Sequence, residues 1–181
     1  MKLKVLFCAL ALGLRADDPR LPRPDQVDKP ENIQLIVPDK TTLSGIVLDN
    51  TDAKLIGEWK HSVHTPPFVG ESYLHDMKEK KGKKSATFTP DIPRTGMYEV
   101  RVSHNSNIRR ANSVPITVRH AKGKTVVRIN EGEPAPIRGL FRSIGIFHFN
   151  QGREGSVTIS TEDTEGKYVI VDALQFLPVM P

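Results

Sequence analysis

Three aspartates have the side-chain chemistry of a calcium site. Asp49 and Asp52 lie close together in the sequence, and Asp172 follows an apolar run far downstream. Ca²⁺ takes about six to eight oxygen ligands, and these carboxylates would supply several if the first and last strands of the fold are neighbours. The other interpretation is structural: Asp49 and Asn50 cap a turn, and Asp172 accepts backbone N–H groups. We favour the structural interpretation, and a structural calcium ion is the only cofactor that the sequence suggests.

Three histidines and a carboxylate form a second candidate group. His61 and His64 lie close together, and His75 directly precedes Asp76. This composition resembles that of many metal sites. Two consecutive prolines interrupt the segment, however, so it is not helical and the spacing sets no ligand geometry. We therefore interpret these residues as ordinary loop histidines.

Aromatic side chains are the groups on which sugar-binding modules stack their ligands. Trp59 is the only tryptophan, and Tyr73 is an aromatic residue further along. With His75 and Arg109 as polar partners, these residues are our candidates for ligand binding at a shallow groove or loop rim. Trp59 has a competing role, because a chain with 6% aromatic residues needs them in its core. We favour core packing for it.

The sequence contains no motif of a known catalytic apparatus. The nucleophile elbow G-x-S-x-G, the zinc motif H-E-x-x-H, the dinucleotide-binding glycine pattern and the P-loop are all absent from it. Glu58, Asp76 and His148 are available as acids or bases, but no spacing pairs them. A carboxylate dyad for glycoside cleavage has no support, so we expect that the protein is not an enzyme.

The charge balance argues against nucleic acid as a partner. The chain carries 26 basic and 21 acidic residues, for a net charge of +5. Lys2, Lys4 and Arg15 belong to an N-terminal segment of targeting type, and without them the charge nearly balances. The only concentrated basic run, at 78–84, contains a glycine and lies between two strand signals. We interpret it as a solvated loop that an acidic polysaccharide could also use, since a nucleic-acid site needs a larger basic face.

The N-terminal segment 1–16 has the layout of a secretory signal peptide. A short basic start precedes the apolar run Val5–Leu14, which is too short to span a bilayer, and Ala16 is a suitable cleavage position. Cys8, the only cysteine, lies in that run without the small residues of a lipoprotein box. The mature protein would then lack cysteine, which excludes disulfides and cysteine-based zinc sites. We expect a secreted or periplasmic protein with no stable membrane span after signal removal.

Residues 17–40 and 41–181 differ in composition. The first segment is rich in proline and charge and is typical of a linker. In the second, short strand signals alternate with turn residues, and no segment has the period of a long helix. This spacing predicts an all-β domain, an antiparallel β-sandwich or jelly roll. The expected strands are 45–48, 53–59, 72–75, 86–89, 97–103, 114–119, 125–130, 140–149, 156–160 and 167–177.

The stretch 85–103 shows the strand pattern most clearly. Tyr98, Val100 and Val102 alternate with Glu99 and Arg101. A period of two with one polar face predicts an antiparallel strand that covers a core. Proline and glycine residues between positions 90 and 96 supply the turn before it. We therefore place Tyr98 in the core rather than in a sugar site.

A set of short motifs occurs in order between residues 46 and 178. They are Asp49-Asn50, Gly57-x-Trp59, Gly70-x-x-Tyr73, Ala86-x-Phe88-x-Pro90-x-Ile92-Pro93-x-x-Gly96-x-Tyr98-Glu99-Val100, Val118-Arg119-His120, Ile144-Gly145-x-Phe147-x-Phe149-x-x-Gly152 and Val171-Asp172-Ala173-x-x-Phe176. This set resembles the golvesin C-terminal-like, or xanthan-lyase carbohydrate-binding-like, domain family. The resemblance implies a galactose-binding-like jelly roll, often appended to secreted bacterial enzymes or oxidoreductases, with a non-catalytic role in binding carbohydrate.

Three functions are therefore considered for this sequence. The first is a secreted, non-catalytic module that binds extracellular or cell-surface polysaccharide, with Trp59, Tyr73, His75 and Arg109 as the candidate contacts. The second is a structural or assembly domain that docks a secreted enzyme or an envelope protein. The third, a small hydrolase or lyase, has the least support, because no spacing pairs its acids and bases.

Overall fold

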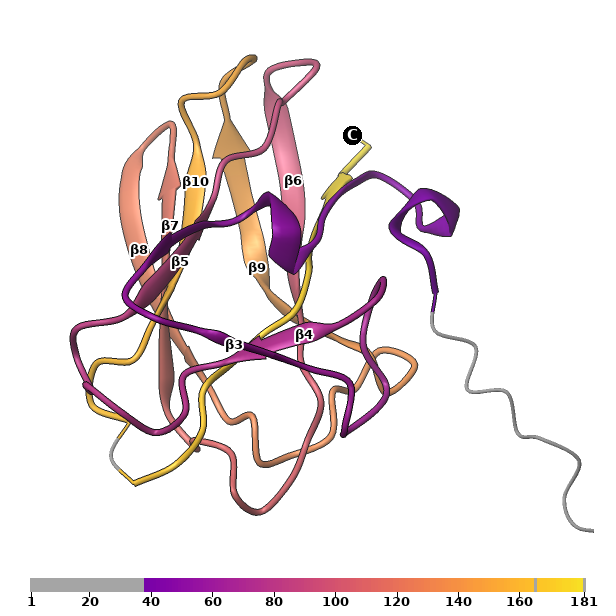
Figure 1. Ribbon diagram of the computed structural model, residues 1–181. Coiled ribbons are helices and arrows are strands. Elements are labelled where there is room, and N and C mark those ends of the chain that lie inside the picture. Colours follow the sequence, from indigo (N-terminus) through magenta and orange to yellow (C-terminus); the bar gives the residue numbers. More distant parts are fainter. Residues whose placement is uncertain (1–37, 165, 181) are drawn as a thin grey trace, which may run out of the picture. The chain divides into compact units, whose positions relative to one another are not determined.

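The computed structural model describes residues 38–164 and 166–180, and there the chain consists mainly of short antiparallel strands (Figure 1). The expected signal peptide at 1–16 and most of the expected linker at 17–40 lie outside the described residues, so these boundaries stay predictions. No helix in the described part is long and apolar enough to cross a membrane. The helical segments found there are two 3-10 turns, η1 (Lys40–Thr42) and η2 (Asn50–Asp52).

Sheet A brings the first and the last strand of the domain together. Its order is β1 (Ile46–Leu48), β12 (Leu174–Pro178), β6 (Gly96–Ser103) and β9 (Phe141–Phe149). Ile46 pairs with Phe176, and Leu48 pairs with Leu174. The residues just after β1 and just before β12 therefore lie near each other in space.

Sheet B forms the second layer of the domain. Its order is β2 (Lys54–Ile56), β5 (Ser85–Phe88), β10 (Ser156–Ser160), β7 (Val114–His120) and β8 (Gly123–Ile129). The strands β7 and β8 form a hairpin that is paired from Val114–Ile129 to His120–Gly123. This confirms the hairpin expected from the alternation of residues 114–119 and the turn that follows.

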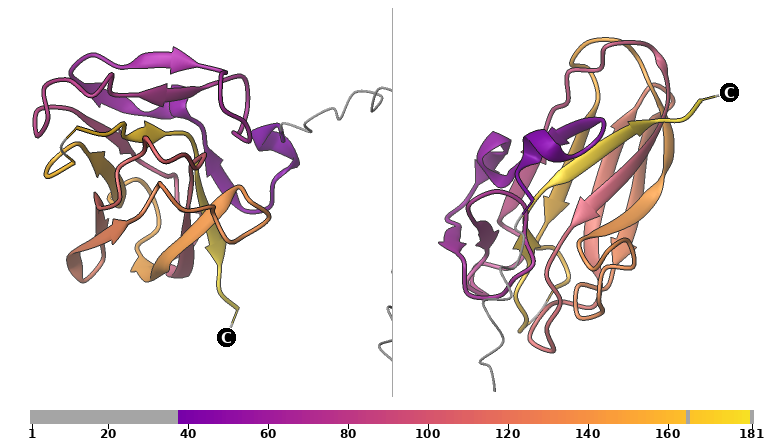
Figure 2. Two further views of the ribbon diagram at one scale, coloured as in Figure 1. Left: turned by 90° about the horizontal axis from the view of Figure 1, so that it is seen from below. Right: turned by 90° about the vertical axis from the view of Figure 1, so that its right-hand side faces the viewer.

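A third, small sheet, sheet C, adjoins the sandwich. Its order is β11 (Ile170–Val171), β4 (Tyr73–His75) and β3 (Lys60–Ser62). In both views of Figure 2, the indigo-to-magenta segment that contains β3 and β4 gathers at one side of the larger sheets. Sheet C therefore lies beside the sandwich rather than in its central layers.

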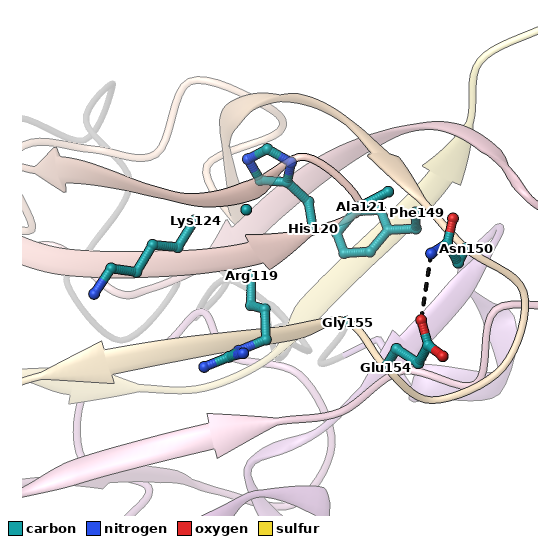
Figure 3. A pocket seen from close by; sticks show the side chains of 9 residues that line it. Arg119, His120, Ala121, Lys124, Phe149, Asn150, Glu154 and Gly155 are labelled. Atoms are coloured by element: carbon teal, nitrogen blue, oxygen red, sulfur yellow. Dashed lines mark hydrogen bonds between the residues drawn. The ribbon is translucent and has the colours of Figure 1, made fainter.

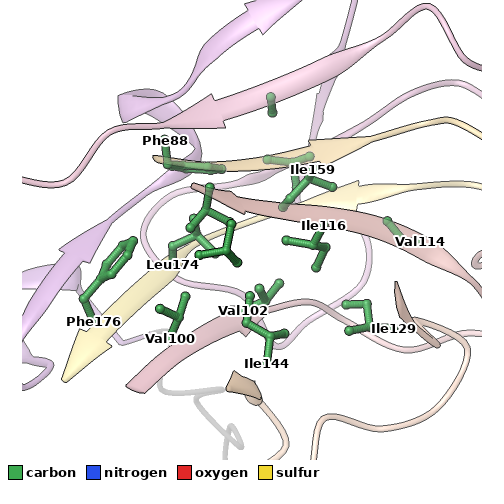
Figure 4. Packing of buried hydrophobic residues seen from close by; sticks show 14 of the residues in the cluster. Phe88, Val100, Val102, Val114, Ile116, Ile129, Ile144, Ile159, Leu174 and Phe176 are labelled. Atoms are coloured by element: carbon green, nitrogen blue, oxygen red, sulfur yellow. The ribbon is translucent and has the colours of Figure 1, made fainter. Parts of the chain in front are cut away.

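The main hydrophobic core draws its side chains from both large sheets (Figure 4). Tyr98, Val100 and Val102 of β6 are at most 4% exposed, and Ile116 of β7 and Ile159 of β10 are at most 1% exposed. Burying an aliphatic side chain of this size stabilises a fold by roughly 1.5–3 kcal/mol. The buried face predicted for β6 is confirmed.

One expected strand ends early because of a glycine. The sequence predicts a strand over 53–59, but β2 ends at Ile56. Gly57 adopts a φ of 77°, which lies in the left-handed region and not in the extended range of a strand. The chain turns there, and β3 begins only at Lys60.

Another expected strand is divided between two sheets. The sequence predicts a strand over 167–177, but Val171 pairs with Leu74 in sheet C and Leu174 pairs with Val102 in sheet A. The chain passes from one sheet to the other at Asp172 and Ala173. Alternation of side chains does not reveal such a change of partner, because both halves keep a buried pattern.

Candidate functional site

A polar pocket of about 560 Å³ lies beside sheet C, and we call it the sheet C pocket. Tyr73, His75 and Arg109, which are three of the four candidate ligand-binding residues, line it. The lining comes from β3 and β4 with the residues that follow β3, from the loop between β6 and β7, and from Tyr168, two residues before β11. The other lining residues are Ser62, His64, Thr65, Asn107, Ile108, Arg110 and Tyr168.

Backbone hydrogen bonds fix the loop that carries Arg109. Its N–H donates to the side-chain oxygen of Asn107 at 3.0 Å, and its carbonyl accepts the N–H of Tyr168 at 2.9 Å. The N–H of Ala111 donates to the carbonyl of Tyr168 at 2.8 Å. The backbone of Arg109 is therefore held in place, while its side chain is exposed at the pocket.

Arg110 is the buried cation of the pocket, with 6% of its surface exposed. Its guanidinium donates to Oδ1 of Asn105 at 2.7 Å and to the hydroxyl of Tyr73 at 3.4 Å. The guanidinium carbon lies 5.7 Å from the ring centroids of Tyr73 and Tyr168, within the range of cation–π attraction. The sequence shows Arg110 only as part of a polar loop, because the rings that bury it belong to distant segments.

The hydroxyl group of Tyr73 receives several hydrogen bonds. The Ser62 hydroxyl donates to it at 3.1 Å. Burial alone would raise the pKa of Tyr73, but hydrogen bonds with Ser62 and Thr65 and the charge of Arg110 together bring this pKa below its ordinary value. With only 2% of the residue exposed, the ring has no open face for a sugar to stack on. Tyr73 would therefore contact a ligand through its hydroxyl group.

The imidazole of His75 is held in one orientation. Its Nδ1 accepts the backbone N–H of Met77 at 3.2 Å, and its ring packs edge-on against Tyr168 with centroids 5.2 Å apart. Burial lowers the pKa of His75, and the charge of Arg110 lowers it further. A neutral ring with Nδ1 as acceptor carries its proton on Nε2. His75 is therefore a hydrogen-bond donor near neutral pH.

Positive charge surrounds the sheet C pocket. None of the described residues that line it is Asp or Glu. Lys60 of β3 lies opposite His75 in the register of sheet C, and the ammonium of Lys78 lies 4.6 Å from the ring centroid of Tyr168. Together with the two arginines, these groups make the pocket cationic.

The basic run 78–84 is only partly solvated. Lys84 is 2% exposed, and its ammonium donates to the carbonyl of Asp76 at 2.7 Å. Lys81 forms an ion pair with the fully buried carboxylate of Asp76. The interpretation of the whole run as a solvated loop is wrong for these two lysines, because the backbone carbonyl of Asp76 holds the ammonium of Lys84 and its buried carboxylate holds that of Lys81.

Trp59 does not lie with the other three candidates. It is half-buried and packs against the main core cluster. Its indole N–H donates to the carbonyl of Ile56 at 3.1 Å. These contacts agree with core packing, and a role of Trp59 in ligand binding stays a prediction.

The three candidate calcium ligands are all hydrogen-bonded to protein donors. Asp49 and Asp52 form a capping box at η2, and Asp52 also accepts the ammonium of Lys40 at 2.8 Å. Asp172 is fully buried and accepts the N–H of Val69 at 3.1 Å and the Ser103 hydroxyl. Within residues 38–164 and 166–180, no group of three or more His, Cys, Asp or Glu side chains is placed to hold a metal ion. These contacts agree with the structural interpretation that we favour for the three aspartates, and calcium binding itself is not tested by them.

A second pocket, of about 500 Å³, lies at the β7–β8 hairpin (Figure 3). Arg119 and Lys124 come from the two strands of the hairpin, and Asn150 and Glu154 follow β9. The side-chain amide of Asn150 donates to Glu154 at 3.3 Å. Because this pocket carries a carboxylate as well as cations, it provides a comparison for the purely cationic sheet C pocket.

The fold is similar to that of solved β-sandwich modules. A family 35 carbohydrate-binding module from Clostridium thermocellum matches with a TM-score of 0.53 at 14% identity, over 76% of this chain and 100% of that module. The GH26-CBM35 β-(1,4)-mannanase of Podospora anserina matches with a TM-score of 0.57 at 18% identity, over 77% of this chain and 29% of that chain. At these identities the likeness concerns the fold alone, and it confirms the predicted all-β jelly-roll sandwich.

The chain belongs to the golvesin C-terminal domain family, whose family model matches residues 46–178. A xanthan lyase from Bacillus sp. (strain GL1) is 34% identical over 147 residues, which cover 78% of this chain and 16% of that relative. The structure of Paenibacillus xanthan lyase matches with a TM-score of 0.70 at 31% identity, over 75% of this chain and 13% of that chain. The family resemblance read from the motifs is confirmed. The chain spans only a small part of these lyases.

Proposed function

We propose that this domain is a secreted, non-catalytic module that binds extracellular or cell-surface polysaccharide at the sheet C pocket. The observation that carries the proposal is the convergence of Tyr73, His75 and Arg109 on one pocket with a fixed backbone. Preorganised donors reduce the entropy lost when a ligand binds. The fold shared with a carbohydrate-binding module supports this choice of ligand, and the layout of residues 1–16 supports export.

The positions of the carboxyl groups support a binding function rather than glycoside cleavage. Cleavage commonly uses two carboxyl groups on either side of the scissile bond, and within residues 38–164 and 166–180 no carboxyl group lines the sheet C pocket. Glu131 and Asp172, whose pKa values burial raises to about 8, are fully buried. Each accepts a backbone N–H, from Ile170 and Val69 respectively. A fully buried carboxyl group cannot reach a polymer bound at the surface.

Affinity gel electrophoresis of the exported full chain tests the proposal. We expect retardation in gels that contain one or more members of a polysaccharide panel, and we expect Arg109→Ala to reduce it. Arg119→Ala removes an exposed arginine from the second pocket and should leave retardation unchanged. Migration unaffected by every polysaccharide would refute the proposal. Release of unsaturated or reducing sugar ends by the purified chain would refute its non-catalytic part.

A second candidate function, docking of a secreted enzyme or envelope protein, is favoured by an apolar groove of about 590 Å³. Met97, Val179 and Met180 line it and are 43%, 41% and 86% exposed. Exposed apolar clusters of this kind occur at protein interfaces. A protein recovered with the chain from culture medium, and lost with Met97→Lys but not with Arg109→Ala, would support this function.

A further inference from the structure

We infer that the sheet C pocket selects acidic polysaccharide and binds the carboxylate of a sugar residue through Arg109 and Arg110. This inference rests on the proposed polysaccharide-binding function and adds the chemical class of the ligand. It is carried by the charge of the pocket, by the burial of Arg110 and by the contacts of the aromatic rings.

The buried charge of Arg110 lacks a carboxylate partner in the part of the chain that the structure describes. A buried cation is costly unless an anion or several hydrogen bonds compensate it. Its Nε has no hydrogen-bond partner among the described residues, and neither has the side-chain nitrogen of Asn105 that lies beside it. An anion that enters the pocket would supply the missing charge.

The buried carboxyl group of Glu131 forms no ion pair with Arg110 in the part of the chain that the structure describes. Glu131 is fully buried, and burial raises its pKa to about 8 although Arg110 acts in the opposite direction. Burial therefore favours the neutral, protonated form of this carboxyl group. Asp76 is already engaged by Lys81. The positive charge of Arg110 is consequently available to a ligand.

Arg109 adds a second guanidinium group to the residues that line the pocket. Its side chain is exposed at the pocket, and among the described residues no carboxylate forms an ion pair with it. A guanidinium group matches a carboxylate with two parallel hydrogen bonds. Hydrogen bonds hold the backbone of Arg109 at this pocket, which Arg110 also lines.

The aromatic rings of the pocket are already occupied by cations. Lys78 and Arg110 lie 4.6 Å and 5.7 Å from the ring centroid of Tyr168, and His75 packs against the same ring. The ring of Tyr73 is buried. A sugar therefore meets cations and hydrogen-bond donors here instead of a free stacking platform, which favours an acidic sugar over a neutral one.

Binding of matched polysaccharide pairs tests the inference. The exported full chain is titrated with polygalacturonate, polyglucuronate and alginate, and with each polymer after carbodiimide–borohydride reduction of its carboxyl groups. We expect at least one acidic polymer to bind about tenfold or more tightly than its reduced form, because a charge-assisted hydrogen bond is lost. Arg109→Gln should weaken that binding by about tenfold. Arg119→Gln in the second pocket should change it less than twofold.

The outcomes separate this inference from the proposed function. Equal binding of acidic and reduced polymers, or binding of neutral polymers alone, overturns the inference and leaves the proposed function standing. No binding to any acidic, reduced or neutral polymer overturns both. Dextran sulfate identifies the source of the anion: binding confined to sulfated polymer overturns the carboxylate assignment. Binding of every polyanion with no effect of Arg109→Gln also overturns the inference, because a diffuse basic surface would explain it.

Discussion

The carboxyl group of Asp172 accepts the backbone N–H of Val69, 103 residues earlier in the chain, at 3.1 Å and 3.2 Å. Asp172 lies where the chain passes from sheet C to sheet A, and Val69 lies in the segment that leads into β4. The Ser103 hydroxyl at the end of β6 also donates to this carboxyl group. One buried side chain thus ties the sheet that supports the pocket to the sandwich.

Removing this carboxyl group should destabilise the domain. Asp172→Ala leaves the N–H of Val69 and the hydroxyl of Ser103 without an acceptor, and each buried unsatisfied group costs about 1–3 kcal/mol. Asp172→Asn keeps an oxygen acceptor in the same place and should cost much less. Urea unfolding followed by tryptophan fluorescence measures both variants. Equal losses of stability in the two variants would show that the hydrogen bonds are not the cause.

The stability of the domain should fall as pH rises from about 6.5 to about 8. Burial raises the folded-state pKa values of Glu131 and Asp172 to about 8, whereas unfolded carboxyl groups titrate near about 4. In this window the folded chain holds protons that the unfolded chain has released, so each group lowers the free energy of unfolding by up to about 1.4 kcal/mol per pH unit. Burial lowers the pKa of His104 to about 4. Because an unfolded histidine titrates near about 6.5, this group changes the free energy of unfolding mainly below about pH 6.5 and has little effect in this window.

Two neutral variants isolate this pH effect. Glu131→Gln and Asp172→Asn each remove one titrating group, so each should flatten the dependence of the unfolding free energy on pH. Glu133→Gln, an exposed neighbour of Glu131, is the matched control and should leave the slope unchanged. A slope that survives in the double variant Glu131→Gln/Asp172→Asn would mean that other groups set it.

Gly70 is a position where a side chain cannot be added without disturbing Asp49. A Cβ atom there would lie 2.4 Å from Oδ2 of Asp49, and the φ of Gly70 is 67°. Gly139 has nearly the same φ, 68°, but an added Cβ would meet no described atom within 4 Å. Gly139→Ala should therefore cost only about 1–2 kcal/mol for the left-handed backbone. Gly70→Ala should lower the stability measured by thermal unfolding clearly more than Gly139→Ala does. Equal losses of stability in the two variants would exclude a clash between the added Cβ and Asp49.

The sequence predicts the sandwich better than the pocket. Tyr98, Val100 and Val102 identify the buried face of β6 because strand side chains alternate between faces. The pocket depends instead on β4 pairing with β11 and on the contact between the loop at Arg109 and Tyr168. These partners are far apart in the sequence, and no local period encodes which of them meet.

Arg110 illustrates what the sequence could not provide. In the sequence it is one of two arginines in a polar loop, equivalent to Arg109. In the structure Arg110 is buried between the rings of Tyr73 and Tyr168, while Arg109 stays exposed. Successive side chains of a loop do not alternate between two faces as those of a strand do. Which of two neighbouring side chains points inward is therefore decided by the tertiary contacts alone.

Calcium should have no effect on the thermal stability of the domain. Asp52 is paired with Lys40, Asp49 caps η2, and Asp172 is engaged by Val69 and Ser103. These oxygens would have to give up protein donors to bind an ion. Melting in EDTA and in excess Ca²⁺, followed by circular dichroism, measures the effect. A rise of several degrees with Ca²⁺ that Asp172→Asn abolishes would establish a calcium site here.

Val100→Asp should unfold the domain. Val100 is fully buried in β6, between the pairing partners Phe176 of β12 and Gly145 of β9. An aspartate there would be an unpaired buried charge, which costs about 4 kcal/mol or more against a typical total stability of about 5–15 kcal/mol.

Met97→Asp introduces the same side chain on the exposed face of the same strand, where Met97 is 43% exposed. We expect that control to fold with nearly unchanged stability, because its carboxylate stays in water. Circular dichroism and urea unfolding compare the two variants, and a cooperatively folded Val100→Asp protein would contradict the assignment of this face to the core.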